Sequence, residues 1–157
     1  MSPRSLFTTL AKAEAVTWTL LVLGMVLKYL TRTTELGVRI GGALHGFVFL
    51  AYVLTTLLVS RDQRWRADST LTALAASVPP WLTLWFERKA DREGLLADHW
   101  RLRRPSDGSP QDDGLLERAC RWLVTHPALA GVVGLVAVSV LFALALAIGP
   151  PVPWARG

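Results

Sequence analysis

Four long apolar stretches, separated by charged segments, organise this chain. They cover about residues 11–30, 41–59, 69–86 and 127–149. Each approaches or exceeds the roughly 20 residues that an α-helix needs to cross the hydrocarbon core of a bilayer. The pattern therefore predicts an all-α, polytopic membrane protein, a bundle of four transmembrane helices that crosses the cell membrane several times. We expect the lipid bilayer to cover much of its surface.

The second apolar stretch, 41–59, has no formal charge but places polar side chains on one helical face. His45, Phe49, Tyr52 and Thr56 follow one another at steps of four, three and four residues. Lipid offers no hydrogen-bond partner, so this face should pack against protein. Two interpretations stay open: a packing face with one hydrogen-bonded histidine, or a site that handles protons or a ligand.

The first apolar stretch, 11–30, carries one charged residue near each end, Glu14 and Lys28. Lys28 beside Tyr29 is typical of an anchor whose long side chain reaches the membrane interface. Glu14 has a shorter side chain and therefore needs a partner within the protein. A cleaved signal peptide is the alternative interpretation, but Glu14 and the lack of a small-residue cleavage site favour a retained helix.

A short polar loop at 31–39 predicts that the first two helices are antiparallel neighbours. With the second helix beginning near residue 41, Lys28 and His45 lie towards one side of the membrane. Glu14 then lies towards the other side, near the level of Thr55 and Thr56, and we expect it either to be hydrogen-bonded to such hydroxyls or to be protonated. Gly41, Gly42 and Gly46 offer small surfaces that another backbone can approach; they lie at the entry of the second helix.

The third apolar stretch, 69–86, is interrupted by Pro79 and Pro80. Proline removes a backbone donor and clashes with the preceding turn, so the sequence predicts a kink near Ser77. The alternative is a helix that ends at Val78 and is followed by a segment at the membrane interface.

A charged linker, 93–126, precedes the last span. Within it, the composition of 105–114 is typical of a flexible segment, and 115–125 has the pattern of a short amphipathic helix on the membrane surface. The last span, 127–149, contains no charged residue and is followed by a tail at 150–157.

The charges and the motifs narrow the function classes. The chain has 17 basic and 12 acidic residues, but they cluster between the apolar stretches, which indicates membrane-flanking charge and no nucleic-acid surface. Cys120 is the only cysteine, so neither an internal disulfide nor a cysteine metal cluster can form. The chain lacks the common nucleophile, nucleotide-binding and metal-binding motifs. We therefore expect no catalytic residue, no cofactor and no metal.

Three function classes remain. The first is an accessory or assembly protein that acts through helix contacts with a membrane-protein partner. The second is a transporter or channel component for a small solute or protons, using Glu14, Lys28, His45 and Tyr52. Four spans are few for a transporter, so this class requires a homo-oligomer. The third and least favoured class is an integral-membrane enzyme.

An even number of spans puts both termini on one side of the membrane. The segments on that side carry six of the basic residues and the opposite segments carry eleven. The positive-inside rule then predicts that 87–126 is cytoplasmic and that both termini are outside.

Residues of the first three stretches form a familiar series. Glu14 is followed by G-M-x-L-K-Y at 24–29, by G-x-x-H-G-x-x-F-x-x-Y at 42–52, by Pro79 and by Glu87-Arg88. This series, over about residues 5–92, resembles a widespread bacterial family of small integral membrane proteins known as domain of unknown function 3817. The resemblance implies a three-span membrane domain over 1–92, and it brings no activity.

The chain departs from the family pattern at three positions. Val26 stands where the family has proline, Ala15 where it often has glycine, and Trp81 where it tends to have small residues. The local packing around Trp81 should therefore differ from that of the family.

Overall fold

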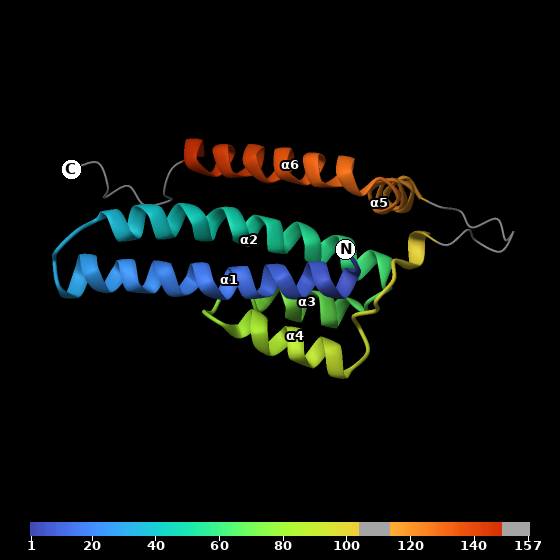
Figure 1. The fold of residues 1–157 in the computed structure, drawn as a ribbon, viewed down its shortest axis with the longest axis horizontal. Coiled ribbons are helices and arrows are strands. Elements are labelled where there is room, and N and C mark those ends of the chain that lie inside the picture. Colours follow the sequence, from blue (N-terminus) through green and yellow to red (C-terminus); the bar gives the residue numbers. More distant parts are fainter. Residues whose placement is uncertain (104–113, 149–157) are drawn as a thin grey trace, which may run out of the picture.

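The computed structural model describes residues 1–103 and 114–148, and in these ranges the chain is helical without strands (Figure 1). The predicted flexible segment, except for Gly114, and the tail lie outside the described residues. In chain order the elements are α1 (Pro3–Met25), the π-helical turn η1 (Val26–Leu30), α2 (Leu36–Asp62), α3 (Ala67–Ala75), α4 (Leu82–Arg92), the 3₁₀ turn η2 (Arg101–Arg103), α5 (Leu115–Thr125) and α6 (Pro127–Ile148).

Three helices in the described ranges are long and apolar enough to cross a membrane. They are α1 with η1, α2 and α6, with 28, 27 and 22 residues. At a rise of about 1.5 Å per residue they measure about 42, 40 and 33 Å, which exceeds the about 30 Å core of a bilayer. The first helix begins at Pro3, where Ser2 caps it by accepting a hydrogen bond from the Ser5 backbone N–H.

α1 and α2 form an antiparallel pair whose backbones meet near the turn that joins them. A Cβ atom on Gly37 would lie 2.8 Å from the Cα of Gly24, and one on Gly41 would lie 3.0 Å from the Cα of Leu21. Such distances leave no room for a side chain, so these glycines permit the close packing. Gly41 thus behaves as expected, whereas Gly46 faces the Phe142 ring of α6.

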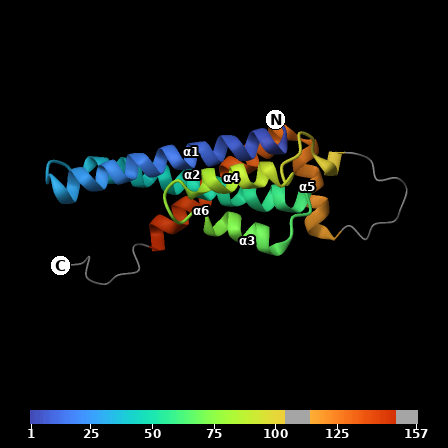
Figure 2. The same ribbon diagram turned by 90° about the horizontal axis from the view of Figure 1, so that it is seen from below.

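The predicted third span, 69–86, is not a continuous helix. α3 ends at Ala75 and α4 begins at Leu82, and the chain reverses between them. α3 lies against α2, where the Tyr52 hydroxyl donates to the Ala73 carbonyl, and α4 runs back along α1. Figure 2 shows this α3–α4 hairpin beside the half of α1 and α2 that is nearer the N-terminus.

The reversal has a local cause in the Pro79-Pro80 pair, for which the sequence left open either a kink near Ser77 or a helix end at Val78. Neither proline can donate a backbone hydrogen bond, and Trp81 follows them with a left-handed φ of 63°. That conformation costs about 1 kcal/mol for a residue other than glycine. A hydrogen bond of 2.9 Å from the Trp81 indole to the Thr19 hydroxyl of α1 holds the turn in place.

The core of the described structure lies between the hairpin and the N-terminal half of α1. The rings of Phe7, Tyr52, Trp65 and Phe86 pack together, with centroid distances from Phe7 of 5.4, 5.6 and 6.1 Å. The chain after α4 closes this end, because Trp100 donates from its indole to the Met1 carbonyl at 2.9 Å. The segment after α4 therefore lies beside the N-terminus.

Asp62, at the end of α2, connects this domain to the last two helices. Its buried carboxylate accepts hydrogen bonds from the backbone N–H groups of Arg101 and Leu102 at 3.2 and 3.0 Å. The Arg101 side chain in turn contacts Glu117 of α5 at 3.2 Å. α5 and α6 have nearly the same bounds as the expected surface helix and last span. α6 packs along α2, runs away from the N-terminal end of the bundle and ends short of the turn that joins α1 and α2 (Figure 1).

Candidate functional site

Two of the polar residues singled out from the sequence, Glu14 and His45, meet inside the bundle. The Glu14 Oε1 atom lies 3.6 Å from the Nδ1 atom of His45, and the Glu14 side chain has no exposed surface. This separation allows an ion pair but is longer than an ordinary hydrogen bond. The pair joins the middle of α1 to the middle of α2.

Along the helix axis Glu14 lies opposite His45, whereas the sequence-based expectation placed it opposite Thr55 and Thr56. α2 begins at Leu36, several residues before the expected start near 41. The early start shortens the turn, so antiparallel packing brings residue 14 opposite residue 45. The hydroxyl that reaches the Glu14 carboxylate in the structure belongs to Thr83 of α4, which donates to Oε2 at 3.4 Å.

Two residues that the sequence analysis did not select complete the surroundings of the pair. Trp18 packs on the imidazole of His45 with ring centroids 4.4 Å apart, and its indole donates to the Ser77 carbonyl at 3.4 Å. Thr83 also donates to the Ala11 carbonyl at 3.2 Å. Trp18 could have been found, because it follows Glu14 by four residues and shares its helical face. Thr83 reaches Glu14 only because the chain reverses at 76–81.

Tyr52 belongs to the aromatic core and not to the Glu14–His45 pair. Its buried hydroxyl donates to the Ala73 carbonyl of α3 at 3.3 Å. Seven residues separate Tyr52 from His45, which is about 10 Å along the helix axis. Tyr52 therefore secures the hairpin to α2.

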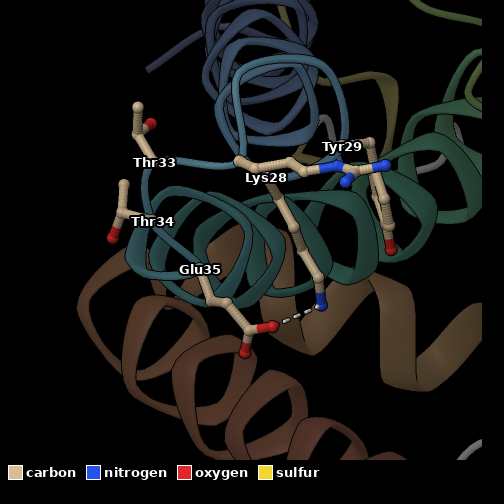
Figure 3. A pocket seen from close by; sticks show the side chains of 6 residues that line it. Lys28, Tyr29, Thr33, Thr34 and Glu35 are labelled. Carbon is tan, nitrogen blue, oxygen red and sulfur yellow. Dashed lines mark ion pairs between the residues drawn. The ribbon is translucent and has the colours of Figure 1, made fainter.

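Lys28 lies far from His45, at the turn between α1 and α2. Its Nζ atom contacts Glu35 Oε1 at 3.3 Å, as Figure 3 shows, and it lines an open groove with Tyr29, Thr33 and Thr34. The structure does not bring the two residues together, because Lys28 lies beside the beginning of α2 and His45 lies nine residues after Leu36, about 14 Å further along the helix axis.

The site can exchange or share a proton between one carboxylate and one imidazole. Within residues 1–103 and 114–148, no group of three His, Cys, Asp or Glu side chains comes together in a way that could hold a metal ion. The pair also links three helices, since Glu14 contacts His45 of α2 and Thr83 of α4. The arrangement therefore suits a structural lock or a proton-sharing pair.

Comparison with known proteins identifies the part of the chain that contains this site. The sequence model of the family described as domain of unknown function (DUF3817) matches residues 4–92. A protein of Streptomyces coelicolor, provisionally named a membrane protein, is 52% identical over 91 residues, which make up 57% of this chain and 11% of that relative. No solved structure matches the chain.

The matched residues cover α1 to α4 and thus include Glu14, His45 and Thr83. Together with three helices that are long and apolar enough to cross a bilayer, the matches show a membrane protein. The chain belongs to the family of domain of unknown function 3817.

Proposed function

We propose that this protein is an accessory or assembly protein of the cell membrane, acting through contacts between its helices and a larger membrane protein. The observation that carries the proposal is the relative in which the matching segment makes up 11% of a longer protein provisionally named a membrane protein. In that relative the domain and a much longer protein form one chain, which supports a role for this domain beside a larger membrane protein.

The packing within the chain supports this proposal. The domain of α1 to α4 has its own aromatic core and buries Glu14, Tyr52 and Asp62 completely. In contrast, Val138 is the single buried residue of α6. The apolar surface of α6 is therefore available to lipid and to the helices of a partner.

We also infer that the chain crosses the membrane three times and that the α3–α4 hairpin enters and leaves on the same side. Three features support this: the chain reverses at Pro79-Pro80, Trp100 contacts Met1, and α4 is too short to span the core at 11 residues. An odd number of crossings puts the two termini on opposite sides. This replaces the expectation that both termini lie outside.

The distribution of positive charge then favours a cytoplasmic N-terminus. The end of the bundle near the turn of α1 and α2 holds three described cations, Lys28, Arg32 and Arg39. The other described lysines and arginines are twelve, and they lie in the half that contains the N-terminus: Arg4, Lys12, Arg61, Arg64, Arg66, Arg88, Lys89, Arg92, Arg101, Arg103, Arg118 and Arg121. By the positive-inside rule, this half faces the cytoplasm.

The size of the native complex tests the accessory function. The chain, tagged at its chromosomal locus, is extracted with its surrounding lipid in polymer nanodiscs and its complexes are weighed. We expect a fixed ratio of this chain to a larger membrane protein, which cross-linkers introduced at exposed α6 positions such as Leu135 and Leu144 should capture. Complexes that contain only copies of this chain would contradict the proposal.

The Glu14–His45 pair favours a second candidate function, a component of a proton-coupled transporter or channel built as a homo-oligomer. A buried carboxylate within reach of an imidazole can pass a proton between two helices. The test is proton flux into liposomes that contain the purified chain. Glu14→Gln should abolish the flux, while Lys28→Gln should leave it unchanged because Lys28 pairs with Glu35. Flux that survives Glu14→Gln, or no flux at all, would exclude this function.

A further inference from the structure

The outward face of α4 carries a groove that combines aromatic and cationic side chains. Its lining residues are Trp81, Leu84, Trp85, Arg88, Lys89 and Arg92, which we call the α4 groove. They recur at steps of three and four residues and so share one helical face. The opposite face of the helix holds Thr83, Phe86 and Ala90, which are buried.

Two of the three cations of the groove, Arg88 and Arg92, are not neutralised by the acidic residues of the same helix. Glu87 accepts a hydrogen bond from Thr8 at 2.7 Å and Asp91 pairs with Arg4 at 3.1 Å, so both carboxylates are directed towards α1. Lys89 contacts Glu93 at 3.9 Å. In the described part of the chain, no ion pair involves Arg88 or Arg92, and both are exposed. The groove therefore presents a net positive charge.

The aromatic end of the groove is held rigidly but remains accessible. The Trp81 indole is hydrogen-bonded to Thr19, and Lys89 lies 5.6 Å from the centre of the Trp85 ring. Even so, Trp81 is 48% exposed and Trp85 is 50% exposed. Half of each side chain thus stays free to contact a ligand.

The order of these side chains along α4 matches a molecule with an anionic head and apolar tails. Trp81 lies at the level of Thr19, about the middle of α1, whereas Asp91 lies at the level of Arg4, near the N-terminal end. Eleven residues separate Trp81 from Arg92, which is about 16 Å along the helix. Tryptophan favours the boundary between headgroups and acyl chains, and arginine forms two parallel hydrogen bonds with phosphate.

We propose that the α4 groove binds an anionic phospholipid, with the phosphate held by Arg88 and Arg92 and the acyl chains lying along Trp85 and Trp81. Charge complementarity favours an anionic ligand, and the position of the aromatic end near the middle of α1 favours a lipid over a soluble anion. The inference does not depend on the proposed function, because a lipid can occupy this groove whichever partner the protein has.

Lipid titration of the purified full chain, followed by native mass spectrometry, tests this inference. The chain is stripped of lipid in a neutral detergent and titrated with phosphatidylglycerol or with phosphatidylcholine that has the same acyl chains. We expect the wild type to bind phosphatidylglycerol more tightly. Equal affinity for the two lipids would overturn the proposal, and this result requires no variant.

Paired substitutions then locate the binding site. Arg88→Gln with Arg92→Gln should weaken phosphatidylglycerol binding about 25-fold, since each cation near an anionic lipid contributes about a factor of five. Arg64→Gln with Arg66→Gln removes the same charge from exposed positions at the same end of the bundle, and should leave the affinity unchanged. Equal losses in the two double variants would show a response to net charge alone and would overturn the assignment to the groove.

Two further measurements distinguish binding of a whole phospholipid from binding of its phosphate group alone. Trp85→Ala should weaken binding of both phospholipids, because it removes apolar contact and keeps the arginines. Millimolar glycerol 3-phosphate, which has the phosphate without acyl chains, should not displace the bound lipid. Displacement by this soluble anion would make the groove a phosphate site and would overturn the lipid proposal.

Discussion

The domain of α1 to α4 and the last helix, α6, are both apolar, yet they are stabilised in different ways. In the domain, Gly24 and Gly37 bring two backbones together, and buried polar groups such as Glu14 bridge three helices. In α6, contact with α2 includes the Phe142 ring, which lies against Phe47 with centroids 6.3 Å apart. Most α6 side chains are exposed on the bundle surface.

The difference between the domain and α6 coincides with the limits of the family match, which covers residues 4–92. Lipid is as apolar as leucine, so burying apolar side chains contributes little to the association of helices in a membrane. Close backbone packing and polar contacts between helices are then what specifies one arrangement of the helices. The domain has the close backbone packing and several buried polar contacts between helices, whereas α6 buries only Val138 and leaves most of its apolar side chains exposed.

Adding one methyl group at the closest contact of α1 and α2 should have the largest effect. A Cβ atom on Gly24 would overlap the backbone of Gly37, which cannot move aside without separating the helices. Gly24→Ala should lower the free energy of unfolding by about 3 kcal/mol or more. Gly42→Ala is the matched control, because its Cβ atom would meet only a flexible Leu21 methyl group at 3.8 Å. Denaturation in mixed micelles measures both, and equal effects would refute the tight crossing.

Breaking the Glu14–His45 pair should have the next largest effect. Glu14→Leu and His45→Leu should each destabilise the protein by about 1–3 kcal/mol, since each leaves the partner buried without its contact. Glu14→Gln keeps the shape and most of the hydrogen-bonding capacity and should be mild. His99→Leu, at an exposed position, is the control for His45→Leu. If all four variants unfolded like the wild type, the pair would contribute nothing to stability.

Removing the Asp62 carboxylate should separate the two regions without unfolding the domain. Asp62→Ala deprives two backbone N–H groups of their acceptor, which costs about 1–3 kcal/mol locally. Hydrogen exchange should then increase in η2 and α5, while α1 and α2 stay protected. Asp68→Ala, which changes an exposed carboxylate, should alter neither region. Faster exchange throughout α1 and α2 would show that the domain depends on α5 and α6.

Truncating the contact of α6 should have the smallest effect on the domain. Phe142→Ala removes the ring that lies against Gly46 and Phe47. The domain should unfold within about 0.5 kcal/mol of the wild type, as expected for a change outside its core. Spin labels on α2 and α6 should report a broader distance distribution, and Leu146→Ala, at an exposed position, should not. A large loss of stability in Phe142→Ala would place α6 within the folded core.

The sequence predicted the helical class and a membrane protein, but not the course of the third apolar stretch. Hydropathy measures how apolar a segment is and cannot tell a crossing helix from a hairpin that packs on α1. Pro79-Pro80 marked the interruption, but the reversal depends on the Trp81–Thr19 hydrogen bond, a contact between residues distant in the sequence. For the same reason Thr83 could not be recognised as the partner of Glu14.

The start of α1 was also missed, because residues 3–10 are amphipathic and place Arg4, Ser5, Thr8 and Thr9 around a buried Phe7. The uniformly apolar part of this helix begins only near residue 11. The helix forms earlier because α4 covers its inner face. Glu14 and His45 could be selected as polar residues in apolar stretches. That they lie opposite each other could not be predicted, because the register of the two helices depends on where α2 begins.

In the proposed topology the third apolar stretch folds back, so that the N-terminus and the segment after α4 lie on the same side of the membrane. Labelling of single cysteines in the full chain tests it directly. Ser5→Cys, Thr34→Cys and His99→Cys, all exposed positions, are introduced separately into a Cys120→Ser background and treated with a membrane-impermeant maleimide. Residues 5 and 99 should react only in inside-out vesicles, and residue 34 only in intact cells. Reaction of residues 5 and 99 from opposite sides would show that the stretch crosses the membrane and would contradict the account.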